Sequence, residues 1–151
     1  MILIRTLIVA AALAAGPCGV PGAVAEDRPV YQRDGYAIGG YDPVAYFLFG
    51  KAMKGSPAHA LVWRGATWLF VSDETMLSFE MNPEAYAPRF GGYCAYGVSE
   101  GRLAGGDPEL FSIIDGRLYL NRNKAARDAW NAHEGERAAA AEENWPAVLG
   151  Q

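Results

Sequence analysis

The stretch Leu110-Phe111-Ser112-Ile113-Ile114-Asp115-Gly116-Arg117-Leu118-Tyr119-Leu120 decides the fold class. Asp-Gly between two apolar runs is the strongest short signal for a β-hairpin, because both residues accept the turn's left-handed backbone. A second hairpin is predicted upstream, where Leu61–Trp63 and Thr67–Val71 are rich in β-branched and aromatic residues. The sequence therefore predicts two hairpins, the earlier one turning at Arg64-Gly65-Ala66.

Short helices are predicted around these hairpins. Ser72 is a good N-cap, with acidic residues following in the first turn. Asn123 caps a helix that runs to about His133 and stops at Gly135. An alanine-rich helix follows from Glu136 to near Trp145-Pro146.

The segment Val44–Phe49 is a continuous apolar run, and periodicity alone leaves it open as a short buried helix or strand. We find no internal repeat and no second domain boundary in the sequence. The fold class expected is α+β: one small domain of two β-hairpins with short helices and a helical C-terminus.

The N-terminal residues 1–25 are predicted to be a Sec-type signal peptide that is cleaved. Arg5 gives a positive start, a short apolar run follows, and Ala23-Val24-Ala25 matches an A-x-A cleavage site. The apolar run is too short to cross a bilayer. We therefore expect a mature single domain at 26–151, exported to a bacterial periplasm and not inserted in a membrane.

The charge argues against two classes of partner. The full chain has a formal charge of −4, and loss of Arg5 with the signal peptide gives −4 − 1 = −5. Nucleic acids and anionic membranes both select for basic surfaces. Neither is expected as a partner.

The glycine-rich stretch Pro88 to Gly97 holds the residue on which the chemistry depends. Cleavage removes Cys18, so Cys94 is the only thiol of the mature chain and has no internal disulfide partner. It is then buried and inert, a metal ligand, or a reactive group. Arg89 is the cation nearest to it in the sequence.

The chain has two histidines, His59 and His133. His133 is placed at a helix C-terminus, where the helix dipole is a sufficient explanation for it. His59 comes just before a predicted hairpin and is the better candidate ligand. A thiolate from Cys94 with an imidazole from His59 would suit copper or zinc, and a third ligand would come from a methionine, a tyrosine or a carboxylate. Asp42, before Pro43, is predicted to be a turn residue.

Several of these motifs together resemble the YHS domain. They are Asp42-Pro43-Val44, then His59, the aromatic hairpin from Trp63 to Ser72, and Asn82-Pro83-Glu84-x-Tyr86. Gly91-Gly92-Tyr93-Cys94 and the Ile114 to Asn121 hairpin resemble the exported YHS domain-containing (seleno)proteins. The resemblance implies metal binding. The family's usual cysteines are replaced here by Ala45 and Val71, so of that pattern only His59 matches.

Three functions remain open. The first is a soft-metal binding protein, copper first, using Cys94 and His59. The second is a thiol-based redox protein in which Cys94 is the catalytic group and an external thiol is the partner. The third is a non-catalytic interaction module with a packed Cys94. The sequence does not decide whether the protein is an enzyme.

Overall fold

The computed structural model describes residues 29–150. The predicted signal peptide and Cys18 lie outside these described residues. The fold is mixed α+β with C-terminal helices, which confirms the predicted class. The elements of the first half are β1 (Gln32–Arg33), β2 (Tyr36–Ala37), η1 (Ile38–Gly40), α1 (Ala45–Phe49), β3 (Ser56–Trp63), β4 (Ala66–Phe70), α2 (Asp73–Met81) and α3 (Pro83–Tyr86). Those of the second half are η2 (Arg89–Gly92), α4 (Ala95–Ser99), β5 (Asp107–Ile114), β6 (Arg117–Asn121), α5 (Lys124–Ala132) and α6 (Glu134–Val148).

Three antiparallel pairs make up the sheets, and two of them are the predicted hairpins β3–β4 and β5–β6. The third, β1–β2, turns at Asp34-Gly35, an Asp-Gly pair for which no hairpin was predicted. The run after Val44 is a helix, α1, which ends at Gly50 in the left-handed conformation. The last helix, α6, begins earlier than predicted and continues through Pro146.

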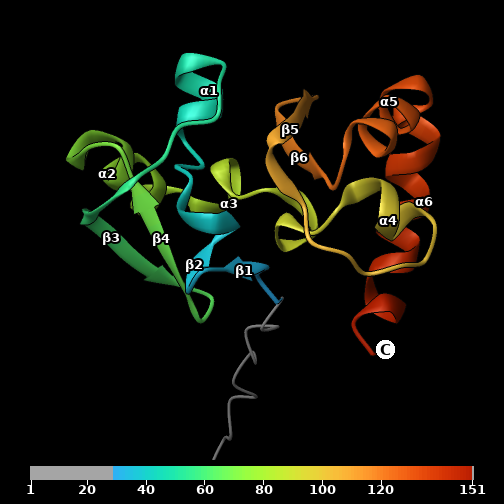
Figure 1. Ribbon diagram of the computed structural model, residues 1–151, viewed down its shortest axis with the longest axis horizontal. Coiled ribbons are helices and arrows are strands. Elements are labelled where there is room, and N and C mark those ends of the chain that lie inside the picture. Colours follow the sequence, from blue (N-terminus) through green and yellow to red (C-terminus); the bar gives the residue numbers. More distant parts are fainter. Residues whose placement is uncertain (1–28, 151) are drawn as a thin grey trace, which may run out of the picture.

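The order of elements repeats along the chain. A tight 3-10 turn, a short helix, a hairpin and two further helices run from η1 to α3, and the same series runs from η2 to α6. We call residues 38–86 the first unit and residues 89–148 the second unit. Figure 1 shows them side by side, the first on the left in cyan to green and the second on the right in yellow to red.

The two hairpins match residue for residue at an offset of 51. In the first unit Ser56 pairs with Phe70 and Ala60 with Leu69, with a bulge between them. In the second unit Asp107 pairs with Asn121 and Phe111 with Leu120, with a bulge at the same place. The helices that follow, α2 and α5, have nine residues each, and Ser72 and Asn123 cap them through the same N–H position.

The cores of the two units also correspond. Trp68 packs on Phe79 with ring centroids 5.1 Å apart, and their counterparts Tyr119 and Trp130 pack at 5.0 Å. The expectation of no internal repeat is therefore wrong. The two units share their backbone structure but few of their side chains. When the residues from β3 to the end of α2 are aligned with those of the second unit, only three positions have the same residue: Pro57 and Pro108, Gly65 and Gly116, Leu69 and Leu120.

The units share one interior rather than folding apart. Leu118 and Leu120 of the second unit are buried in the cluster formed by Trp68, Phe70 and Phe79 of the first. Burial of such apolar side chains is the main stabilising term in a chain of this size. No helix among residues 29–150 is long and apolar enough to cross a membrane.

Candidate functional site

Cys94 lies between η2 and α4, where it is the N-cap residue of that short helix. Its side chain is 2% exposed. The preceding turn is left-handed at Phe90, Gly91 and Gly92, with φ of 55°, 61° and 85°. The Cys94 N–H donates to the Ala104 carbonyl at 2.8 Å, and Cys94 bridges to Leu120 of β6. These contacts fix the cysteine against the edge of the second hairpin.

The sulfur of Cys94 accepts two backbone hydrogen bonds. The Gly97 N–H donates to Sγ at 3.4 Å from the first turn of α4, and the Arg122 N–H donates at 3.3 Å from just beyond β6. The thiol in turn lies 3.8 Å from Oδ1 of Asn121. Backbone donors converging on sulfur stabilise negative charge there.

The repeat identifies the counterpart of Cys94 as Asp42. Gly39-Gly40-Tyr41-Asp42 matches Gly91-Gly92-Tyr93-Cys94, and the Asp42 N–H donates to the Met53 carbonyl at 2.9 Å as Cys94 does to Ala104. Val71, which matches Arg122, donates its N–H to Asp42 Oδ2 at 2.9 Å.

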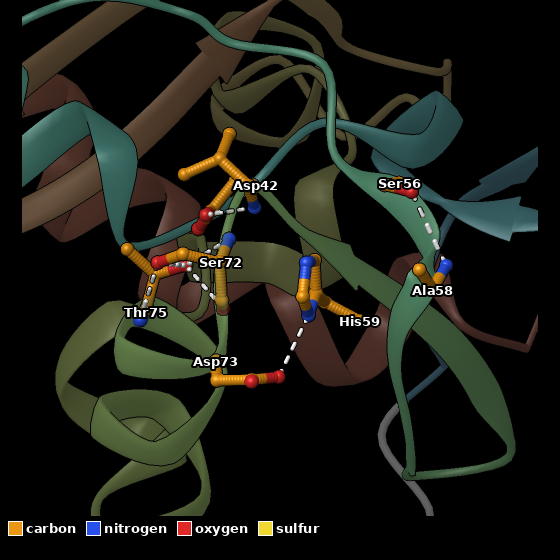
Figure 2. Close-up of polar contacts among 8 residues, drawn as sticks. Asp42, Ser56, Ala58, His59, Ser72, Asp73 and Thr75 are labelled. Atoms are coloured by element: carbon orange, nitrogen blue, oxygen red, sulfur yellow. Dashed lines mark hydrogen bonds and ion pairs between the residues drawn. The ribbon is translucent and has the colours of Figure 1, made fainter.

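The other oxygen of Asp42, Oδ1, accepts from the N–H groups of Val44 at 2.8 Å and Ala45 at 3.3 Å at the start of α1. The Asp42 side chain is fully buried, and Figure 2 shows it close to Ser72. Asp42 is thus the anchor of its helix and more than the turn residue predicted. In the second unit, the sulfur of Cys94 occupies the place of this carboxylate.

Asn121 is a second departure from the repeat. It takes the place of Phe70, and its side chain is fully buried. Its Oδ1 accepts the N–H of Tyr96 at 3.1 Å, while its Nδ2 has no hydrogen-bond partner. The second unit has therefore exchanged a carboxylate and an aromatic ring for a thiol and an amide in contact with each other.

A pocket of about 360 Å³ reaches Cys94. Tyr96 and Gly97 line it on one side, and Arg102 and Arg122 line another part. Both arginines are exposed, and neither forms an ion pair within the described part of the chain. Cys94 is therefore buried yet belongs to the lining of a pocket whose charged residues are both arginines.

Gly97 allows α4 to lie close to the backbone of Arg102 at the edge of the pocket. A Cβ at this position would lie 3.1 Å from the Arg102 carbonyl oxygen and 3.7 Å from the Cys94 sulfur. The first of these is tighter than an ordinary van der Waals contact. A side chain at position 97 would press on the segment that carries Arg102.

Arg89, the cation nearest in sequence, does not face the thiol. It pairs with Glu142 on α6 and lines a different pocket, together with Trp145. The cations beside Cys94 are Arg102 and Arg122, which follow it by 8 and 28 residues. Sequence proximity pointed to the wrong arginine because η2 turns the chain sharply between Arg89 and Cys94.

His59 lies in the other unit. It is on β3, and its Nδ1 is 2.7 Å from Oδ1 of Asp73, the first residue of α2 (Figure 2). In Figure 1, β3 and α4 stand at opposite ends of the molecule's long axis. The structure thus does not bring His59 and Cys94 together. Residues 29–150 contain no group of three or more His, Cys, Asp and Glu that could hold a metal ion.

Comparison of the chain with protein-family models, with curated proteins and with solved structures found no match. The resemblance to the YHS domain stays a prediction. Asn121, Arg102 and Arg122 were missed by the sequence analysis. The signal that could have found Asn121 is the 51-residue offset, which places this amide where a strand otherwise ends in a buried phenylalanine.

Proposed function

We propose that this chain is a thiol-based redox protein of an exported, oxidising compartment, in which Cys94 reacts with small molecules that enter its pocket. One observation carries the proposal: the sulfur accepts the N–H groups of Gly97 and Arg122, the counterparts of two of the three N–H groups that hold the Asp42 carboxylate in the first unit. Such donors stabilise the thiolate, which is the nucleophilic form of cysteine.

The partner is an external thiol or disulfide, because Cys94 is the only cysteine among the described residues. The thiolate attacks one sulfur of a disulfide, a bond forms between Cys94 and that sulfur, and the other half leaves as a thiolate. A second external thiol then restores Cys94 in the same way. Arg102 and Arg122 favour partners that carry carboxylates, since guanidinium groups bind carboxylates well.

The soft-metal function, copper first, has less support. Backbone N–H groups donate hydrogen bonds and do not ligate metals, and they occupy the immediate surroundings of the sulfur. His59 is engaged with Asp73 in the other unit. A metal at Cys94 would therefore need ligands other than His59.

Alkylation by iodoacetamide at pH 7 tests the proposal, with modification of the Cys94 peptide followed by mass spectrometry. We expect the native thiol to react faster than the same thiol in urea-unfolded protein, because only the fold supplies the N–H donors. Cys94→Ser is the control for signal from other sites. A native Cys94 that stays unmodified while the unfolded one reacts would mean a packed thiol and an interaction module.

A further inference from the structure

Asn121 leaves a buried hydrogen-bond donor without an acceptor. Its Nδ2 has no partner, although the side chain is fully buried. Native proteins rarely leave such a group unpaired, because the cost of removing it from water is then not offset by a hydrogen bond within the protein. The same amide has its Oδ1 within 3.8 Å of the Cys94 sulfur, so the unpaired donor belongs to a group that faces the thiol.

The first unit indicates what kind of acceptor fits at this position. Asp42 presents two oxygens, one to the N–H groups at the start of α1 and the other to the Val71 N–H. At Cys94 a single sulfur atom accepts from both directions, at the ordinary N–H···S distances of 3.4 and 3.3 Å. A sulfur that carries two oxygens and one negative charge would reproduce the carboxylate.

We propose that Cys94 is a site of oxidation to the sulfinate, held as a stable product by the Gly97 and Arg122 N–H groups, which are the counterparts of two of the donors that hold Asp42 in the first unit. The sulfinate oxygens accept from the Gly97 and Arg122 N–H groups and provide the acceptor that Asn121 Nδ2 lacks. This proposal rests on the reactive thiolate of the proposed function. It adds that the oxidised form of Cys94 that the fold stabilises is the sulfinate and not a disulfide.

The oxidant is hydrogen peroxide or an organic hydroperoxide, and each step consumes one molecule of it. The thiolate attacks a peroxide oxygen, an S–O bond forms, the O–O bond breaks, and the leaving hydroxide or alkoxide takes a proton to become water or an alcohol. The resulting sulfenate attacks a second peroxide in the same way and gives the sulfinate and a second molecule of water or alcohol. In each step sulfur loses two electrons and the peroxide gains them. No second cysteine among residues 29–150 is present to divert the sulfenate into an internal disulfide.

In the experiment, the purified protein is treated with hydrogen peroxide and the mass of the Cys94 peptide is measured over time by mass spectrometry. An untreated sample is alkylated with iodoacetamide in parallel. We expect a product heavier by two oxygen atoms that persists in excess peroxide, with the three-oxygen product forming at least about tenfold more slowly. In Asn121→Ala the ratio between the rates of formation of the two-oxygen and three-oxygen products should fall severalfold, because the amide that donates to the sulfinate is gone.

A pair of variants checks the site without oxidation. Cys94→Asp and Cys94→Asn have the same shape, but only the aspartate offers two acceptor oxygens to the converging N–H groups. We expect the aspartate variant to melt at the higher temperature. The reverse order would contradict the proposed sulfinate, and this comparison remains valid even if Asn121→Ala fails to fold.

The outcomes separate the two proposals. If Cys94 is alkylated but peroxide yields only a disulfide between the Cys94 residues of two chains, or only the three-oxygen product, the sulfinate proposal is wrong and the thiol function stands. If Cys94 reacts with neither reagent in the folded protein, both proposals are wrong.

Discussion

At the scale of single residues, the exchange of Asp42 for Cys94 between the two units is the most informative feature of the chain. Both side chains sit after a left-handed Gly-Gly turn and receive N–H groups from a short helix and from the end of a strand. A carboxylate in that position only holds its helix in place. A sulfur with the same donors can also react, because a thiolate is a strong nucleophile.

The two arginines of the pocket should select anionic reagents. We expect Arg102→Gln and Arg122→Gln each to lower the ratio of the iodoacetate to the iodoacetamide rate at Cys94 by about two- to threefold, because a unit charge near a pocket is worth a few tenths of a kcal/mol to about 1 kcal/mol in water. Arg117→Gln is the matched control, since it makes the same charge change on the exposed turn of β5–β6. An equal loss in all three variants would mean an effect of net charge alone.

The predicted copper site can be tested one ligand at a time. We expect His59→Ala to leave the stoichiometry of Cu⁺ binding unchanged, because His59 and Cys94 belong to different units (Figure 1). Isothermal titration of both variants against the wild-type protein checks this. A loss of binding in His59→Ala equal to that in Cys94→Ser would restore the shared site predicted from the sequence.

At the scale of elements, two helix glycines look alike in sequence and differ in surroundings. Gly135 lies in the first turn of α6 with open space around its Cβ position, whereas a Cβ on Gly97 would press on the Arg102 carbonyl. Gly135→Ala should stabilise the protein by about 0.5 kcal/mol through reduced backbone entropy of the unfolded chain. Gly97→Ala should lose that gain and slow alkylation of Cys94.

Urea unfolding of both variants, with the alkylation rate at pH 7, gives the measurement. The decisive quantity is the difference between Gly135→Ala and Gly97→Ala in the change of the free energy of unfolding, because the gain in helix propensity is the same in both variants. Equal stabilisation in both variants, with unchanged alkylation, would show that position 97 is not constrained by the pocket.

The elements themselves could largely be predicted from the sequence. The Asp115-Gly116 turn, the Ser72 and Asn123 caps and the apolar runs each specify local structure, and the structure has all of them. The end of α5 near His133 could be predicted, but Gly135 did not stop the chain from forming a helix again. A glycine ends a helix only where the backbone adopts a left-handed turn, which composition does not reveal.

The site could be predicted only in part. Cys94 stood out as the sole thiol of the expected mature chain, but its neighbours come from residues 97, 102 and 121–122, which approach it only through folding. The repeat could not be recognised in the sequence, because the two units share burial, backbone angles and hydrogen bonds but few side-chain identities. A polar residue such as Asn121 at the end of a strand looks ordinary until its counterpart is known to be a buried phenylalanine.

At the scale of the whole molecule, a hydrogen bond and a ring contact join the two units. Tyr46 on α1 donates its hydroxyl to the Pro108 carbonyl on β5 at 3.0 Å. Its ring packs edge-on against Phe111 at 4.8 Å. Burial raises the pKa of the Tyr46 hydroxyl, with further increases from the carboxylates of Glu109 and Asp107 and from Tyr41. The contact therefore depends on a neutral tyrosine.

Removing this hydroxyl should weaken the contact between the units. Tyr46→Phe is expected to lower the free energy of unfolding by about 1 kcal/mol at pH 7, because the Pro108 carbonyl loses its partner in a buried setting. The ring contact with Phe111 is kept, so the loss isolates the hydrogen bond. Chemical unfolding at pH 7 gives the measurement, and no change would mean that water replaces the hydroxyl.

The same variant predicts a specific alkaline dependence. Because the folded pKa of Tyr46 lies above its unfolded value, the stabilisation is complete below about pH 10 and is lost as the pH rises beyond it, where the unfolded tyrosine ionises and the folded one stays neutral. The wild-type advantage over Tyr46→Phe should then disappear by about pH 11, since each pH unit above the unfolded pKa costs about 1.4 kcal/mol. All other titrating groups are common to both proteins, so the difference between their unfolding curves reports Tyr46 alone. An advantage that stayed constant from pH 8 to pH 11 would show that Tyr46 ionises equally well in the folded protein, and would remove it as a buried link between the two units.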